Sequence, residues 1–272
     1  MDKIKPFLRW AGGKTWFTKH IEEFLPENFS NYYEPFVGGA SIFLHLKSNG
    51  LIKNKAYLSD SNKELINTYR VIKSSPKDLI YALRNFKNNS DEYYKIRNQT
   101  FDNLIEQAAK FIYLNKTSFN GLYRVNSKGI YNVPFGKRQT KDLFEFENIL
   151  NVSTQFKNTF FSVDDFKNKC KKAKANDLVF LDPPYTVAHE NNGFIAYNQS
   201  LFSWQNQIEL AQHLELLTEN RAFYILTNAN HESINNLYTN GNKKVLSRAS
   251  TIGGVGAKRT NYNEIIISNV RK

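Results

Sequence analysis

Short apolar segments recur along the chain, each four or five residues long and bounded by polar or turn-forming residues. Such segments are typical of β-strands. Seven strands are predicted, at Tyr32–Pro35, Ala56–Asp60, Thr159–Val163, Leu178–Asp182, Phe223–Thr227, Lys243–Ser247 and Glu264–Ser268. Longer stretches with apolar residues at helical spacing predict helices at Ala40–Asn49, Lys63–Lys73, Pro76–Phe86, Asp102–Asn115 and Trp204–Glu219.

The predicted strands are unevenly distributed. They lie before residue 62 or after residue 158, and the segment between is mostly helical and then rich in Gly and Asn around 119–136. This order is typical of an α/β sheet with a helical module inserted after its second strand. We therefore expect one domain built from residues 1–62 and 152–272, and a second domain at residues 63–151.

Charge changes the picture further. The 272-residue chain has a net charge of +12, which favours a polyanionic partner, nucleic acid above all. Two tracts, Gln107–Lys141 and Ser233–Asn263, hold basic residues and no acid, as expected for two walls of a phosphate-binding groove. Solubility alone is the alternative explanation for the positive net charge. The chain has no apolar stretch of membrane-spanning length, and a single cysteine, Cys170, fits a reducing cytoplasm.

The sequence Asp182-Pro183-Pro184-Tyr185 directly follows an apolar strand segment. Two prolines cannot continue a strand, so the chain leaves the sheet at its carboxyl edge, where open α/β sheets bind ligands. The motif presents a carboxylate, a carbonyl and an aromatic face. That set can accept hydrogen bonds from an exocyclic amine and stack on its ring, although the tetrapeptide alone also fits a simple turn.

Two glycine-containing segments precede this motif. In Phe7–Lys14, Gly12 and Gly13 allow close backbone approach to a ligand, Trp10 can stack on a flat ring and Lys14 can meet a carboxylate. A tight turn with a buried tryptophan is the alternative.

The second segment, Glu34–Phe43, joins a strand to a helix through Gly38-Gly39. About twenty residues later, Asp60 ends the next strand, a spacing that suits a carboxylate binding ribose hydroxyls. A helix cap is the alternative for Asp60.

Several chemistries lack sequence support. The histidines are scattered and Cys170 is solitary, so no metal site is expected. No phosphate-binding loop of the GxxxxGK[ST] type and no GxGxxG pattern are present. Cys170 also lacks the context of a nucleophile that attacks a pyrimidine ring.

Together the motifs resemble those of the Dam-type DNA adenine-N6 methyltransferases in the α order, with the methyl-donor motif first, target recognition next and DPPY last. The resemblance covers essentially the whole chain, at Phe7–Lys14, Glu34–Phe43, Leu58–Asn62, Tyr113–Gly136, Leu178–Tyr185 and Asn263–Asn269. It implies a seven-strand, Rossmann-like S-adenosylmethionine-dependent methyltransferase core with an inserted, mainly helical target-recognition domain.

The resemblance also implies roles for individual residues. Catalysis is assigned to Asp182, Pro183 and Tyr185, which would bind and stack on a flipped-out adenine. S-adenosylmethionine, without a metal, would be bound by Trp10, Lys14, Glu34, Phe36, Gly38, Asp60, Asp165 and Asp182.

The segments Asn115–Lys128 and Tyr131–Gly136 resemble the GATC-specific branch. The resemblance as a whole implies DNA contacts by Arg9, Phe119, Asn120, Leu122, Arg124, Pro134, Lys137 and Arg138. In that branch Phe119 enters the stack near the vacated base, Arg124 reads a guanine, and Leu122 and Pro134 lie by thymine methyl groups. Phe119 stands where tyrosine is more common, and Lys137-Arg138 replaces a Gly-Arg-Tyr pattern. A β-hairpin with an Asn-Gly turn is also predicted for this segment.

The expected activity is methyl transfer to adenine N6 in double-stranded DNA. The alternatives are cytosine-N4 methylation, RNA adenine methylation and a catalytically silent DNA-binding protein. Asp rather than Ser at position 182 argues against the first of these, and the complete set of cofactor residues argues against the last. We expect a cytoplasmic protein associated with the nucleoid through DNA, and the family also allows a cognate restriction endonuclease as partner.

Overall fold

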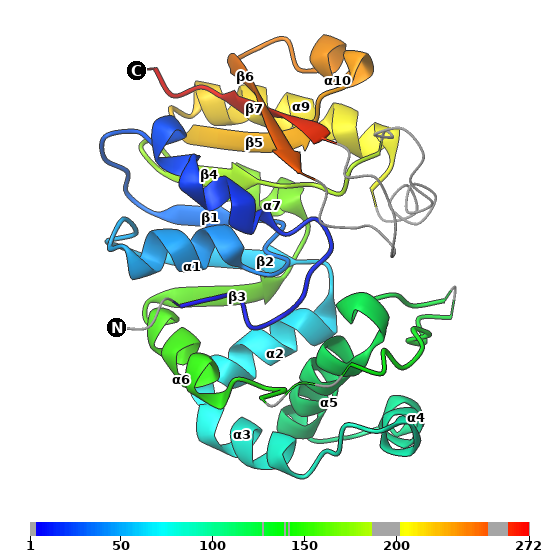
Figure 1. The fold of residues 1–272 in the computed structure, drawn as a ribbon. Coiled ribbons are helices and arrows are strands. Elements are labelled where there is room, and N and C mark those ends of the chain that lie inside the picture. Colours follow the sequence, from blue (N-terminus) through cyan, green and yellow to red (C-terminus); the bar gives the residue numbers. More distant parts are fainter. Residues whose placement is uncertain are drawn as a thin grey trace. The chain divides into compact units, whose positions relative to one another are not determined.

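The computed structural model describes residues 4–126, 128–138, 140, 142–186, 202–249 and 261–271. Its centre is a seven-stranded sheet in the order β3-β2-β1-β4-β5-β7-β6 (Figure 1). The strands are β1 (Tyr32–Glu34), β2 (Ala56–Asp60), β3 (Thr159–Val163), β4 (Leu178–Leu181), β5 (Phe223–Ala229), β6 (Asn242–Ala249) and β7 (Asn261–Ser268). All seven predicted strands are confirmed, and so is the α/β fold class.

Strand pairing explains where the ends differ from the sequence prediction. β1 pairs in parallel with β2 and β4, and β4 pairs in parallel with β5. β7 is antiparallel to β5 and to β6, and its ladder with β6 runs from Asn242↔Ser268 to Ala249↔Asn261. Backbone hydrogen bonds thus extend β6 and β7 beyond the apolar residues that revealed them. β4 ends at Leu181, one residue earlier than predicted, before the two prolines.

Nine α-helices are present among the described residues. They are α1 (Ser41–Ser48), α2 (Lys63–Ser74), α3 (Pro76–Arg84), α4 (Ser90–Asn98), α5 (Leu104–Thr117), α6 (Phe146–Gln155), α7 (Phe166–Lys172), α9 (Trp204–Glu219) and α10 (Glu232–Leu237). Short 3₁₀ helices occur at η1 (Lys14–Lys19), η2 (Ile21–Phe24) and η3 (Phe119–Gly121).

Side-chain caps fix several helix starts. Asn62, Asn103 and Ser203 each accept a hydrogen bond from a backbone N–H in the first turn of α2, α5 and α9. Ser203 and Asn206 form a reciprocal capping box.

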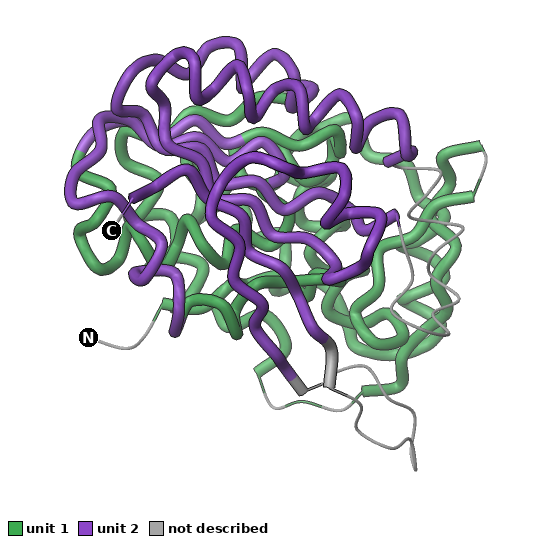
Figure 2. The backbone as a smooth tube through the Cα atoms, turned by 90° about the horizontal axis from the view of Figure 1, so that it is seen from above, with its two compact units in different colours: residues 1–18, 37–53, 59–163 green, residues 19–36, 54–58, 164–272 purple. Residues whose placement is uncertain are grey.

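The chain forms two compact units (Figure 2). Unit 1 comprises residues 1–18, 37–53 and 59–163, and unit 2 comprises residues 19–36, 54–58 and 164–272. Within unit 1, helices α2 to α6 follow β2, precede β3 and form a helical module. Its central helix, α5, packs against α2 and α3 (Figure 1). The boundaries at residues 62 and 152 remain a prediction.

The core of unit 2 holds the carboxyl ends of β4 and β5 in place. Val179 and Leu181 of β4 and Leu226 of β5 are buried in one apolar cluster with side chains of α7 and α9. Because these strands are parallel and in register, their last residues lie at the same edge of the sheet. The core therefore presents the residues after Leu181 and Leu226 side by side.

No helix among the described residues combines the length and apolar character needed to cross a membrane.

Candidate active site

Asp182 lies at the carboxyl edge of the sheet in unit 2, directly after β4. Thr227 of β5, which is fully buried, donates a hydrogen bond from Oγ1 to Asp182 Oδ1 at 2.7 Å. Leu181 pairs with Leu226 across the two strands, and this register brings Thr227 beside Asp182. The neighbouring strand thus orients the carboxylate that the sequence predicts to be catalytic.

The Tyr185 side chain is fixed at its hydroxyl end. The hydroxyl donates to Glu264 Oε2 at 2.6 Å, and Arg248 Nε donates to Glu264 Oε1 at 2.5 Å. Burial raises the pKa of Tyr185 well above its usual value near 10, and the Glu264 carboxylate raises it further. The hydroxyl is therefore protonated at neutral pH and acts as a donor.

A buried polar network follows the motif. Gln207 of α9 donates from Nε2 to Thr186 Oγ1 at 3.3 Å, and its Oε1 accepts from Asn228 Nδ2 and from the Tyr238 hydroxyl. Gln207 and Asn228 are both fully buried. Such a network is stable only when its groups are satisfied, so it favours a single conformation for Thr186, directly after the motif.

Unit 2 also contains three residues predicted to contact the cofactor. Glu34, at the end of β1, is buried and accepts a hydrogen bond from the Tyr32 hydroxyl at 2.7 Å. Phe36 stacks on Phe166, with ring centroids 5.5 Å apart. Asp165 is exposed and caps α7 by accepting from Lys167 N.

In unit 1, Gly38 and Asp60 are joined directly. Gly38 N donates to Asp60 Oδ2 at 3.1 Å, Asn62 N donates to Asp60 Oδ1 at 3.0 Å, and the buried Tyr69 hydroxyl donates to Gly38 O. Burial raises the pKa of Asp60, whereas backbone N–H groups act in the opposite direction. Helix α2 is capped by Asn62 rather than by Asp60. The Asp60 carboxylate therefore shapes the glycine turn.

Trp10 contacts both the glycine turn at Gly38 and the predicted DNA-reading segment at Tyr123. A Cβ on Gly38 would lie 2.8 Å from Trp10 Cδ1 and Nε1, so this glycine makes room for the indole. On another side the indole stacks on Tyr123, with centroids 5.9 Å apart and an interplanar angle of 21°. Lys14 is buried, and its Nζ donates to Gly12 O at 3.0 Å.

The change Gly38→Ala should lower the free energy of unfolding by about 1–3 kcal/mol, because the new methyl group would overlap Trp10. Gly38 also has a positive φ of 42°, which disfavours any side chain. Gly50→Ala is the matched control, since Gly50 has φ 71° but open space at its Cβ position. Urea unfolding of both variants measures the difference, and equal losses would contradict a packing role for Gly38.

The predicted DNA-reading segment of unit 1 is a short hairpin. Val125 and Tyr131 form an antiparallel bridge, and Asn126 N donates to Ile130 O. The hairpin prediction is confirmed, but Asn126 and Ile130 flank its turn. Asn120-Gly121 instead lies in η3, with Asn120 at φ 55°, so the predicted position of the Asn-Gly turn was wrong. The Asn126 side chain, which accepts from the N–H groups of Lys128 and Ile130, stabilises the actual turn.

Several side chains of this segment are displayed to solvent. Phe119 is 52% exposed, and Arg124, Pro134, Lys137 and Arg138 are exposed as well. Leu122 is half-buried. Arg124 Nε donates to Asn132 Oδ1 at 2.8 Å, which leaves its two terminal nitrogens without a hydrogen-bond partner among the described residues. Arg124 thus presents the fork of donors that guanine recognition requires.

Arg9 is tied to the same segment through Asn115. Arg9 N donates to Asn115 Oδ1 at 2.9 Å, and Asn115 Nδ2 donates to the carbonyls of Arg9 and Gly121. Gly121, with φ 65°, passes so close to the Arg9 side chain that a Cβ would lie 2.4 Å from it. The first motif and the hairpin therefore form one packed structure within unit 1.

The predicted residues fall into two groups. Unit 1 contains Arg9, Trp10, Lys14, Gly38, Asp60 and the DNA-reading residues, and unit 2 contains Glu34, Phe36, Asp165, Asp182, Pro183 and Tyr185. The sequence did not predict that Thr227 and Glu264 contact the motif, or that Arg248 supports Glu264. Within the two basic tracts, Lys141 and residues 250–260 lie outside the described residues.

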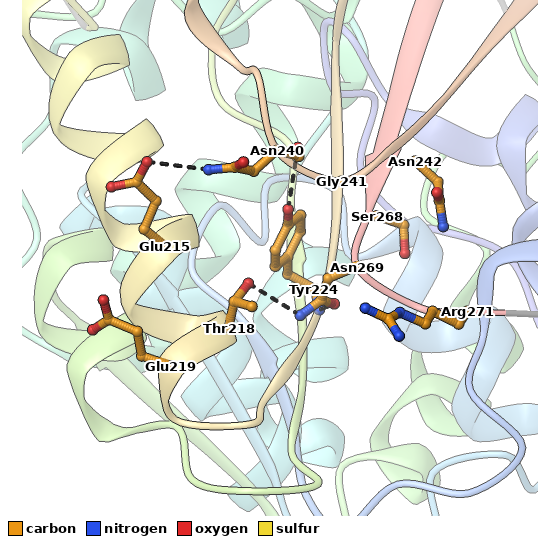
Figure 3. Close-up of a pocket in the computed structure, with 10 residues that line it drawn as sticks. All are labelled: Glu215, Thr218, Glu219, Tyr224, Asn240, Gly241, Asn242, Ser268, Asn269 and Arg271. Carbon is orange, nitrogen blue, oxygen red and sulfur yellow. Dashed lines mark hydrogen bonds between the residues drawn. The ribbon is translucent and has the colours of Figure 1, made fainter.

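Two further features of unit 2 lie away from this site. Burial raises the pKa of the Cys170 thiol to about 12, so it is protonated and unreactive at neutral pH. A polar cavity of about 720 Å³ lies at the amino end of β5, opposite the edge that carries Asp182 (Figure 3). Its lining mixes acids, amides and Arg271, which indicates no single ligand class.

Comparison with known proteins identifies the family. A family model for D12 class N6 adenine-specific DNA methyltransferases matches residues 10–252. The chain is 34% identical over 276 residues to a protein named Type II methyltransferase M1.LlaDCHI from Lactococcus lactis subsp. cremoris, covering 98% of this chain and 95% of the relative.

Two further relatives span similar lengths. Type II methyltransferase M.MjaIII of Methanocaldococcus jannaschii is 35% identical, with 98% of this chain and 99% of the relative covered. A DNA adenine methylase of Serratia marcescens is 33% identical, with 98% of each chain covered. The chain therefore belongs to the D12 class of N6 adenine-specific DNA methyltransferases.

Proposed function

We propose that this enzyme methylates N6 of the adenine in GATC in double-stranded DNA, with Asp182, Pro183 and Tyr185 as catalytic residues. The observation that carries the proposal is the DPPY motif at the carboxyl end of β4. Asp182 is oriented by Thr227 and Tyr185 by Glu264, so both side chains are held before substrate arrives. Such preorganisation is what a positioning mechanism requires.

The family implies S-adenosylmethionine as the methyl donor, and the residues fit it. Trp10, Lys14, Gly38 and Asp60 in unit 1 and Glu34, Phe36, Asp165 and Asp182 in unit 2 are the proposed contacts. Asp60 ends a parallel strand beside a glycine turn, and its carboxylate suits hydroxyl donors. Asp165 is exposed and Asp182 is partly buried, so both can still accept hydrogen bonds from a ligand. When bound, S-adenosylmethionine supplies the activated methyl group.

The protein's contribution to chemistry is to prepare the target amine. Flipping the adenine out of the duplex costs on the order of a few kcal/mol, and stacking on Tyr185 offsets part of that cost. The Asp182 carboxylate and the Pro183 carbonyl accept the two hydrogens of the amino group. Because proline has no N–H, its position in the motif adds no competing donor. The amine is thereby held with its lone pair directed at the donor methyl.

Recognition of GATC is supported by the exposed face of the hairpin. Arg124 offers two donors that match O6 and N7 of guanine. The exposed Pro134 and half-buried Leu122 offer apolar atoms to thymine methyl groups, and exposed Phe119 can occupy the space that the flipped base leaves. Asn120 and Arg9 are further proposed DNA contacts, and the exposed Lys137 and Arg138 are proposed to contact phosphates.

Plasmid DNA tests the recognition sequence. After incubation with enzyme and S-adenosylmethionine, the plasmid should resist a nuclease blocked by GATC adenine methylation and become sensitive to one that requires it. DNA isolated from a host without adenine methylation is the substrate, and plasmid incubated without enzyme is the control. Methyl incorporation without any change at GATC would reject this sequence and keep the enzyme class.

Two further proposals concern the enzyme's setting. Two relatives are named Type II methyltransferases, which supports a cognate restriction endonuclease as partner. Because the substrate is DNA, we expect the enzyme to work in the cytoplasm, associated with the nucleoid.

A further inference from the structure

Glu264 is an acidic residue that is fully buried, and burying a charged group costs free energy. It lies in β7, opposite Ala229 of β5 and Leu246 of β6, and its side chain has no exposed surface. Isolated buried carboxylates are strongly disfavoured, and Glu264 is compensated by Arg248. Replacing such a pair by apolar residues is often neutral or stabilising. Stability alone therefore does not explain why an acid occupies this position.

The second partner of Glu264 suggests the explanation. Its Oε2 accepts the Tyr185 hydroxyl at 2.6 Å, while its Oε1 is held by Arg248. Tyr185 is thus fixed at its backbone end by two prolines and at its ring end by a carboxylate. A ring held at both ends has one direction for its long axis, and because a phenolic O–H prefers the plane of its ring, the direction of the hydrogen bond to Glu264 also favours one ring plane. A ring held only at its backbone can turn about its side-chain bonds.

We propose that Glu264, supported by Arg248, is a positioning residue for methyl transfer. It sets the plane of the Tyr185 ring, and with it the orientation of the stacked adenine. The inference rests on the proposed role of Tyr185 toward the target base. Arg248 donates to one oxygen of the Glu264 carboxylate, and this directs the other oxygen toward the Tyr185 hydroxyl. Glu264 acts through Tyr185 and does not touch the substrate.

A double-mutant cycle tests this inference. The single-turnover rate of methyl incorporation into mixed-sequence plasmid DNA is measured for the wild type, Tyr185→Phe, Glu264→Gln and the double variant. Each single change should lower the rate about tenfold, as expected for the loss of a hydrogen bond to a charged group. Tyr185→Phe keeps the ring but loses the hydroxyl. Adding Glu264→Gln to Tyr185→Phe should therefore cause little further loss.

A purely structural role would give a different pattern. If Glu264→Gln only reduced the folded fraction, it would lower the rate by the same factor in both backgrounds, and that result would overturn the inference. So would a wild-type rate for Tyr185→Phe, a variant that does not disturb the buried ion pair and keeps the test decisive if Glu264→Gln folds poorly. The KM for DNA should change less than the rate.

Two controls complete the design. Glu23→Gln removes the carboxylate paired with Lys244, also on β6, and should leave the rate unchanged because this pair lies on the surface. Asp182→Ala reports separately on the proposed function. An additive cycle together with an inactive Asp182→Ala enzyme would reject only the role of Glu264, whereas an active Asp182→Ala enzyme would reject the catalytic assignment itself.

Discussion

Replacing Asp182 by alanine should lower the rate of methyl transfer by about 10²–10³-fold, the loss typical of removing one preorganised catalytic hydrogen-bonding group. The carboxylate accepts a hydrogen bond from Thr227 on one oxygen and is partly accessible, so it can accept the target amine as well. Alanine removes this acceptor but leaves both prolines and Tyr185. DNA affinity should be nearly unchanged, because the residues proposed to read DNA belong to another part of the chain.

Rate and affinity are measured separately, by single-turnover methyl incorporation and by equilibrium DNA binding. Asp78→Ala is a matched control, since it removes one exposed acid and changes the net charge equally. A variant at position 182 that retains most of its turnover in a preparation free of host enzyme would refute the catalytic role of Asp182.

Replacing Arg124 by alanine should relax recognition at one guanine, lowering discrimination against other bases there by about 1–3 kcal/mol, or roughly five- to 150-fold in specificity. The reason is geometric: Asn132 accepts a hydrogen bond from Arg124 Nε, and the two terminal nitrogens form the fork that we propose reads the base. The measurement compares kcat/KM on duplexes with GATC and with single substitutions at each position.

Lys137→Ala provides the contrast. Lys137 is an exposed cation proposed to contact phosphate, so its loss should weaken binding to all sequences alike and reduce the salt dependence by about one unit of slope. If Arg124→Ala instead weakened all duplexes uniformly, Arg124 would be a phosphate contact and the proposed guanine contact would be wrong.

The sheet was predictable from sequence because its strands are short apolar segments between turn residues. Ala56–Asp60 and Thr159–Val163 have the bounds that the sequence predicts. Helix α4 escaped prediction because few of its residues are buried, chiefly Tyr93 and Ile96, and its start depends on the Asn89 cap. The shorter α7 and α10 depend similarly on the caps Asp165 and His231. Local capping carries no apolar pattern and is easily missed.

The residues proposed for catalysis were predictable from sequence, but the residues that hold them in place were not. Asp182 and Tyr185 stand in a recognisable motif, whereas Thr227 and Glu264 follow 45 and 79 positions after their partners. Their proximity depends on the pairing of β5 with β4 and β7, which no single segment reveals. The same holds for Trp10 and Tyr123, which meet because Asn115 joins two distant segments.

The place of the helical module in the sheet has a consequence for how this enzyme class diversifies. The module begins after β2 and ends before β3, and these strands are neighbours at the outer edge of the sheet. The chain thus leaves and returns without crossing β1, β4 or β5. Lengthening an insertion between two neighbouring strands adds little to the entropic cost of bringing its ends together. Evolution can therefore enlarge the module, which we propose reads the DNA sequence, or exchange it for another, while the strands that carry the proposed catalytic residues keep their register.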